Sequence, residues 1–302
     1  MGQNKKILVS GASGLIGAAL TSTLHVEGHA VHRLARERSD DPNTVYWKPS
    51  TGEIEREKLE GYDAVVHLAG ENIAGGRWND ERKARILNSR VDGTHLLAES
   101  LATCTAKPKV LVCASATGYY GDGGDSELAE DSPRGKGFLA DVVEEWEDAA
   151  DPARKANIRT VHLRFGVVLA AEGGALEKML TPFKTGMAGK LGDGKQWMAW
   201  ISRDDAVRSI QFAIENESLS GPVNAVSPTP VTNEEFTNAL GDVLNRPTVM
   251  SIPVFALRML AGEMADEMLL VSNRAVPRKL LAAGFQFSHT NLAKTLHQIL
   301  DE

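Results

Sequence analysis

Short apolar runs alternate with longer segments of helical periodicity along the first half of the chain. The apolar runs have the length of β-strands and predict strands at residues 6–10, 30–34, 64–68, 109–114 and 160–165. Between them, the helical spacing of apolar residues predicts helices that include 15–27 and 81–102. Buried strands separated by helices are typical of a parallel sheet with helices on both faces. The pattern therefore predicts an α/β protein with a Rossmann-type, doubly wound parallel sheet.

Beyond the fifth predicted strand this alternation weakens, and turn sequences such as GDGKQ and SPTP interrupt the chain. Thr232 and Glu235 have the spacing of a capping box, which indicates the start of a helix. We expect a first domain over 1–170 and a smaller, mostly helical C-terminal lobe over 171–302, which would hold the substrate. Residues 199–227 are expected to return to the first domain.

The segment KKILVSGASGLIGAAL places three glycines between the first predicted strand and the first predicted helix. Gly11 permits a tight turn, Gly14 allows a pyrophosphate to approach the backbone, and Gly17 lets the helix pack closely on the strand. The helix start also offers free N–H groups and a partial positive charge to phosphates. The motif favours dinucleotide binding over a purely structural glycine turn. The expected contacts are Gly11, Ser13, Gly14, Leu15, Ile16 and Gly17.

The end of the second predicted strand should contact the adenosine ribose of a dinucleotide. An acidic residue there favours NAD, whereas the segment AVHRLARERSDD ends its strand on Ala35 and Arg36. A planar guanidinium suits a phosphate, and the first acidic residue, Glu37, follows only afterwards. NADP(H) is therefore expected as the cofactor in preference to NAD(H). The alternative interpretation is that Arg36 and Arg38 are a solvated pair at the strand exit.

The stretch CASATGYYG, residues 113–121, places hydroxyl groups at the carboxyl end of the fourth predicted strand. Open α/β sheets bind their ligands at this edge, so Ser115, Tyr119 and Tyr120 are candidate catalytic residues. The alternative is a glycine-rich loop in which the aromatic rings pack and the hydroxyls bond to the backbone. His67, which ends the third strand, is expected to be a buried strand residue and not a base.

These segments resemble a known family. Five segments, in their order along the chain, resemble the successive motifs of an extended short-chain dehydrogenase/reductase. They are the glycine motif, VVHLAGENI, ASATGYYG, RFGVVL and WISRDDAV. Other segments resemble one atypical branch, the NAD-dependent epimerase/dehydratase-like or 39U-type epimerase family proteins, which have a C-terminal domain of their own. These segments are HLAGENIAGGRW, Ser89 and Arg90, GFLADVVEEWE, and GEMADEMLLVSNRAVPRKLLAAGFQF. The resemblance covers essentially the whole chain and implies that residues 1–170 are an NAD(P)-binding Rossmann domain. It further implies cofactor contacts at Leu68, Ala69, Gly70, Glu71, Arg77 and Val167. Ser115 takes approximately the place of the serine or threonine that binds the reacting oxygen.

The chain departs from that family in its catalytic pair. The wider superfamily uses a tyrosine with a lysine four residues later, because a nearby ammonium lowers the pKa of the phenol. None of the four tyrosines of this chain is followed by such a lysine. Where the pair should fall, the helix GFLADVVEEWE offers Asp141 and Glu144 instead.

Two functional hypotheses follow. The first is an NADP-dependent oxidoreductase or epimerase-like enzyme that acts on a small carbonyl or alcohol, with Ser115 and a tyrosine of the GYYG loop orienting the oxygen. The second is a non-catalytic NADP-binding protein with a regulatory or redox-sensing role. The missing Tyr-x-x-x-Lys pair favours the second hypothesis, whereas the hydroxyl cluster and the complete C-terminal lobe favour the first.

Composition narrows the range of partners. The chain has 302 residues, of which 42% are hydrophobic, so it can bury a large core. A net charge of -7 without a basic run argues against nucleic acid or an anionic membrane, and leaves a small-molecule substrate as the expected partner. Cys104 and Cys113 have no spacing typical of a metal site or a disulfide framework. We expect no metal, a cytoplasmic protein without a signal peptide, and a monomer or homodimer.

Basic residues on the second predicted helix and in the loop before it allow two interpretations. Arg77, Lys83 and Arg90 could bind an acidic substrate, but a solvated helix face is the expected arrangement.

Overall fold

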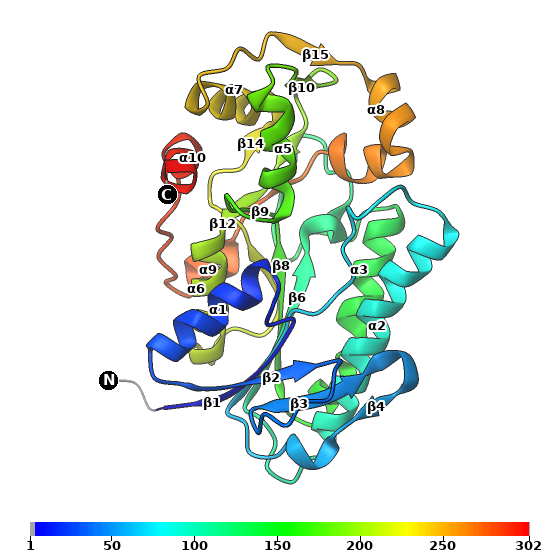
Figure 1. The fold of residues 1–302 in the computed structure, drawn as a ribbon, viewed down its shortest axis with the longest axis vertical. Helices are drawn as coiled ribbons and strands as arrows, with labels where there is room; N and C mark the ends of the chain where they lie inside the picture. Colours follow the sequence, from blue (N-terminus) through cyan, green and yellow to red (C-terminus); the bar gives the residue numbers. More distant parts are fainter. Residues whose placement is uncertain (1–3, 302) are drawn as a thin grey trace.

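The computed structural model describes residues 4–301 and is built around one central sheet (Figure 1). The sheet has eight strands, which in spatial order are β13 (Gly221–Ala225), β8 (Arg159–Phe165), β6 (Val110–Ala116), β5 (Ala64–His67), β1 (Lys6–Ser10), β2 (Ala30–Ala35), β3 (Thr44–Lys48) and β4 (Glu53–Ile54). All neighbours pair in parallel except β3 and β4, which are antiparallel. The chain grows from β1 toward β3 and then from β5 in the other direction, so the predicted doubly wound sheet is confirmed.

Helices cover both faces of this sheet (Figure 1). One face is covered by α1 (Leu15–Val26) and α6 (Arg203–Glu215), and the other by α2 (Asp80–Ala102), α3 (Phe138–Asp148) and α4 (Asp151–Lys155). Leu20 and Ile210 pack with Val9 on the first face, whereas Leu97 packs with Leu111 on the second. The predicted strands and helices begin and end within two residues of those observed. For β1, β5 and β6 the reason is that these buried strands are mostly apolar runs.

The C-terminal lobe has a core of its own and is mostly helical. Its helices are α5 (Gly174–Lys184), α7 (Asn233–Val243), α8 (Val254–Ala261), the π-helical η4 (Ala265–Leu269), α9 (Arg278–Ala282) and α10 (Leu292–Asp301). Phe183, Trp200, Phe236 and Leu296 form the centre of this core. Helix α7 begins at the predicted capping box, in which Thr232 and Glu235 bond to each other's backbone. Helix α9 is the exception to this separate core, because it packs against β13 and its Leu280 belongs to the core of the central sheet.

The remaining elements are short. They are the 3-10 helices η1 (Pro49–Thr51), η2 (Arg56–Lys58) and η3 (Thr117–Tyr120), and the strands β7 (Glu127–Leu128), β9 (Val167–Leu169), β10 (Gly189–Leu191), β11 (Trp197–Met198), β12 (Trp200–Ser202), β14 (Val231–Thr232), β15 (Met250–Ile252) and β16 (Arg274–Ala275). Strand β12 pairs with β9, and the chain then runs through α6 into β13 at the edge of the central sheet. Within residues 4–301, no helix has both the length and the apolar character that a membrane crossing requires.

The carboxyl ends of the parallel strands lie beside the C-terminal lobe. Strand β6 runs into η3, and the lobe contacts this turn through a hydrogen bond from Asn273 to the carbonyl oxygen of Thr117. Strand β8 leads directly through β9 into α5 of the lobe. Ligands of open α/β sheets bind at this edge, so the fold places the candidate site between the sheet and the lobe.

Candidate functional site

The glycine loop leaves no room for side chains. Gly11 has a φ of +66°, and a Cβ atom on it would lie 2.9 Å from the backbone nitrogen of Ala69. A Cβ atom on Gly17 would lie 2.1 Å from the carbonyl oxygen of Gly11, so α1 approaches the loop as closely as the sequence predicted. Gly14 is the N-cap of α1 and provides no side-chain cap. The first N–H groups of the helix therefore stay available to an anion.

A buried serine and a buried histidine connect the strand before the glycine loop with the LAG segment. Ser10 accepts hydrogen bonds from the N–H groups of Leu68 (3.1 Å) and Ala69 (3.2 Å), and its hydroxyl lies 2.7 Å from Nδ1 of His67. Because both N–H groups donate to the Ser10 oxygen, the hydroxyl proton goes to Nδ1, which must be unprotonated. The proton of neutral His67 is then on Nε2, which has no partner within residues 4–301. His67 is fully buried, as predicted, and joins the glycine loop to the LAG segment.

This arrangement predicts a pH-dependent stability. Burial lowers the pKa of His67 from 6.5 to about 4, so below the unfolded-state pKa the unfolded chain binds the proton first. Going from about pH 7 to about pH 5, this histidine should lower the free energy of unfolding by about 2 kcal/mol. Denaturant unfolding of His67→Asn should lack that part of the pH dependence. The exposed His25 gives the control, because His25→Asn should keep the full dependence. Equal pH dependence in wild type and His67→Asn would contradict this.

Arg90 is buried and holds the LAG loop, so the expectation of a solvated helix face is wrong for this residue. It is 7% exposed, and its guanidinium donates to the carbonyl oxygens of Glu71 (3.0 Å) and Ile86 (3.1 Å). A Cβ atom on Gly70 would lie 3.4 Å from Cζ of Arg90, so the guanidinium packs directly against this part of the loop. Burial lowers the pKa of Arg90 to about 10. Sequence analysis missed this role because α2 carries charges all around its first turns.

Arg36 and Arg38 are not equivalent. Arg36 is exposed at the end of β2 and forms no ion pair or side-chain hydrogen bond within residues 4–301. The guanidinium of Arg38 instead lies 4.2 Å from the centre of the Tyr46 ring and 4.0 Å from the carboxylates of Glu53 and Glu55. Arg36, the arginine predicted to bind a phosphate, is thus the one of the two whose guanidinium has no ion-pair or hydrogen-bond partner within the described residues.

The other predicted cofactor contacts surround this edge with different exposures. Those that are exposed are Ser13, Gly14, Gly70 and Arg77, and those that are half-buried are Gly11, Leu15, Ile16, Ala35, Leu68, Ala69, Glu71 and Val167. The N–H of Val167 donates to the carbonyl oxygen of Ala199 (2.8 Å). Glu71 forms an ion pair with Arg82 (2.7 Å), and its N–H donates to Ser89. Their roles in cofactor binding stay predictions.

The hydroxyl cluster is part of a buried polar network. Ser115, Arg164 and Asn224 are register partners on β6, β8 and β13, so their side chains share one face of the sheet. Ser115 donates to the carboxylate of Glu147 on α3 (2.6 Å), which also binds Arg164 through two bonds of 2.8 and 2.7 Å. Arg164 donates to the hydroxyl of Tyr120 (3.1 Å), which donates to Asn224 (2.7 Å). The network ties the end of three strands to α3 and η3.

The three candidate hydroxyl groups differ in their hydrogen bonds. Burial raises the pKa of Tyr120 to about 12, although Arg164 acts against this. Burial would lower the pKa of Arg164, but the hydrogen bonds and charge of Glu147 outweigh it and raise that pKa. The hydroxyls of Ser115 and Tyr120 are both engaged within the protein. Tyr119 is half-buried with its ring centre 3.5 Å from the Arg164 guanidinium, and its hydroxyl has no hydrogen bond within the described residues.

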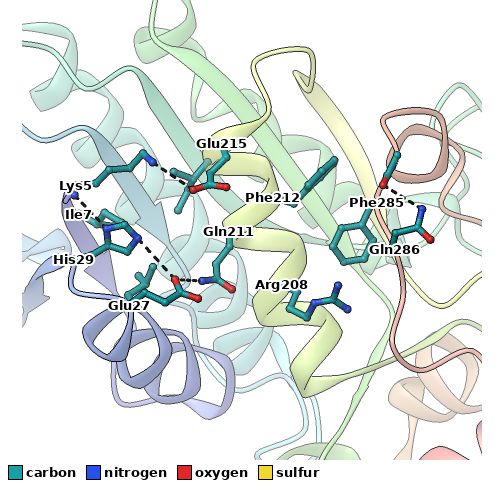
Figure 2. A pocket seen from close by; sticks show the side chains of 13 residues that line it. Lys5, Ile7, Glu27, His29, Arg208, Gln211, Phe212, Glu215, Phe285 and Gln286 are labelled. Atoms are coloured by element: carbon teal, nitrogen blue, oxygen red, sulfur yellow. Dashed lines mark hydrogen bonds and ion pairs between the residues drawn. The ribbon is translucent and has the colours of Figure 1, made fainter. Parts of the chain in front are cut away.

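A surface depression of about 570 Å³ lies away from this edge (Figure 2). It lies where β1 begins and α1 ends, beside α6. Because β1 begins there, the depression is at the opposite end of the strands from the glycine loop. Lys5 forms an ion pair with Glu215 (3.4 Å) across it, and Glu27 accepts a hydrogen bond from Gln211 (2.6 Å). Within residues 4–301, no cluster of histidine, cysteine and acidic residues has the geometry of a metal site.

Comparison with known proteins gives the same family across the chain. A model of the NAD dependent epimerase/dehydratase family matches residues 7–225, and a model described as a domain of unknown function (DUF1731) matches residues 252–299. An epimerase family protein of Mycobacterium tuberculosis is 44% identical over 97% of this chain and 97% of its own length.

Two solved structures are similar in both sequence and fold. The crystal structure of human epimerase family protein SDR39U1 (isoform 2) with NADPH is 34% identical, has a TM-score of 0.88, and covers 98% of this chain and 99% of its own. The nucleoside-diphosphate sugar epimerase of Corynebacterium glutamicum is 35% identical with a TM-score of 0.82, over 99% of this chain and 58% of its own. This chain therefore belongs to the NAD dependent epimerase/dehydratase family, as an atypical short-chain dehydrogenase/reductase of the SDR39U1 type.

Proposed function

We propose that this protein is an NADP(H)-dependent oxidoreductase or epimerase-like enzyme that acts on a small carbonyl or alcohol. The observation that carries the proposal is the combination of an uncapped start of α1 with the unpaired guanidinium of Arg36. The first suits a pyrophosphate and the second a ribose 2′-phosphate. The human relative with NADPH supports the same cofactor.

The residues of this edge fit such a cofactor. The backbone from Gly11 to Gly17 would hold the pyrophosphate, and Leu68 to Gly70 would lie along the adenosine side. Val167 follows β8 and would border the nicotinamide. When bound, NADPH would supply a hydride from C4 of its nicotinamide to a carbonyl carbon, and the alkoxide formed would take a proton from water. Glu71 and Arg77, in the loop that follows the LAG segment, would lie beside the cofactor.

We assign contact with the substrate oxygen to Tyr119. Its hydroxyl has no partner within the described residues, whereas the hydroxyls of Ser115 and Tyr120 are engaged. Those two side chains would act by holding η3 in place, through Glu147 and Arg164. Because no Tyr-x-x-x-Lys pair exists, most of the rate enhancement would come from positioning and electrostatics.

Replacing Arg36 by Ser tests the cofactor assignment. Loss of a charged, bidentate contact with the 2′-phosphate should raise the KM for NADPH about 10- to 100-fold, with kcat and the KM for NADH unchanged. The measurement is NADPH consumption with a panel of aldehydes and ketones. Arg38→Ser is the matched control and should change neither KM by more than about twofold, because Arg38 already contacts Tyr46 and two glutamates.

The same assay separates the outcomes. An equal rise of both KM values in Arg36→Ser would contradict a 2′-phosphate contact. Binding of NADPH without consumption over the panel would instead support a non-catalytic NADP-binding protein.

A further inference from the structure

The side chain of Asn273 is buried but only half satisfied. It is 9% exposed, and its Nδ2 donates to the carbonyl oxygen of Thr117 (2.8 Å). Its Oδ1 is buried and has no donor within residues 4–301. The orientation of the amide is fixed, because a flip would place Oδ1 against the carbonyl oxygen of Thr117. Asn273 therefore keeps one hydrogen-bond acceptor unused.

This acceptor belongs to the candidate site by its position. Thr117 begins η3 at the carboxyl end of β6, and the N–H of Asn273 donates to the carbonyl oxygen of Trp197 (2.8 Å). Two residues after Trp197, Ala199 accepts from the N–H of Val167 at the start of β9. Asn273 thus lies between the ends of two central strands, where the reacting part of a ligand is expected.

The neighbouring Ser272, in contrast, uses its hydroxyl group both as an acceptor and as a donor. Ser272 accepts from the N–H of Trp197 (3.0 Å) and donates to the carbonyl oxygen of Gly124 (2.6 Å). A buried acceptor without a donor costs stability, and Oδ1 of Asn273 is such an acceptor within residues 4–301. The unused oxygen therefore points to a donor that arrives with a ligand.

We propose that Oδ1 of Asn273 accepts a hydrogen bond from a hydroxyl group of the substrate, close to its reacting carbonyl. The proposal rests on the proposed function and extends it to hydroxylated carbonyl compounds. The substrate is favoured over the cofactor as the source of the donor because Asn273 bonds to η3, which carries Tyr119, and forms no hydrogen bond with the glycine loop within residues 4–301.

The test compares glyceraldehyde with propanal, which lacks the hydroxyl groups. Dissociation constants are measured by saturation-transfer NMR on the NADP⁺-loaded protein, so no turnover is needed. Wild type should bind glyceraldehyde about 10-fold more tightly, the effect of one good hydrogen bond. Asn273→Leu should reduce this ratio to near one, with the affinity for NADPH changed less than about twofold.

Ser272→Ala is the matched control, because it breaks two structural hydrogen bonds in the same segment and should leave the ratio unchanged. Equal affinities in wild type, or a preference that survives Asn273→Leu, would overturn the proposal. A fall in NADPH affinity in Asn273→Leu would also overturn it, by assigning Oδ1 to the cofactor. Absence of NADPH binding in wild type would contradict the proposed function instead, and the two aldehydes would then be compared in the cofactor-free protein with the same criteria.

Discussion

Replacing Glu147 by Gln is expected to lower the free energy of unfolding by about 3 kcal/mol. The substitution keeps the shape of the side chain and removes its charge, so the guanidinium of Arg164 stays buried without a counter-ion. Arg164 is 2% exposed and cannot turn toward water without breaking the end of β8. Arg164 also donates to the hydroxyl of Tyr120 (3.1 Å), so the loss should extend to η3. Denaturant unfolding with two independent probes measures the change.

A surface ion pair on the same helix gives the matched control. Glu144 lies one turn earlier on α3 and binds Arg134 (3.1 Å), with half of its side chain exposed. Glu144→Gln should cost less than about 0.5 kcal/mol, because exposed pairs contribute little. Equal small costs for the two variants would show that Arg164 does not depend on Glu147 and would remove the structural role given to the network.

Replacing Gly17 by Ala is expected to weaken NADPH binding by at least about 100-fold. The new methyl group would lie 2.1 Å from the carbonyl oxygen of Gly11, so either α1 or the loop must move. The N–H groups at the start of α1 would then lose their common direction toward the pyrophosphate. Losing two charge-assisted hydrogen bonds, each contributing about 1.5 kcal/mol or more, accounts for the expected factor.

Loss of stability must be kept apart from loss of binding in this variant. Overpacking at Gly17 should also lower the free energy of unfolding by about 1–3 kcal/mol. Ser22→Gly weakens the same helix by about half a kcal/mol at an exposed position away from the loop, and should leave the affinity for NADPH unchanged. Normal NADPH affinity in Gly17→Ala would mean that the cofactor does not use the start of α1.

The fold and the glycine loop could be predicted because their signals are local. Strands β1, β5 and β6 are mostly apolar runs, and each glycine of the loop is required by the turn or by the helix start in which it lies. The different surroundings of Arg36 and Arg38 could not be predicted from the local sequence. They depend on contacts of Arg38 with Tyr46, Glu53 and Glu55, which come from later segments of the chain.

The supports of the site depend on contacts between distant segments. Glu147 is one of several acidic residues of α3, and only the register of Ser115 with Arg164 across two strands selects it. A clue was present in the sequence, because Arg164 is a charged residue next to the carboxyl end of a buried strand. Arg90 lies on a helix rich in charges, and its burial follows from the LAG loop folding back over it. Periodicity alone does not report such contacts.

The central claim is that the carboxyl edge of this sheet binds NADPH in preference to NADH. Titration of the purified protein with each cofactor, followed by energy transfer from its five tryptophans to the nicotinamide, tests it most directly. We expect saturable binding of NADPH, at least about 10-fold tighter than binding of NADH. Absence of binding by either cofactor would contradict this assignment, because the glycine loop would then be only a structural turn.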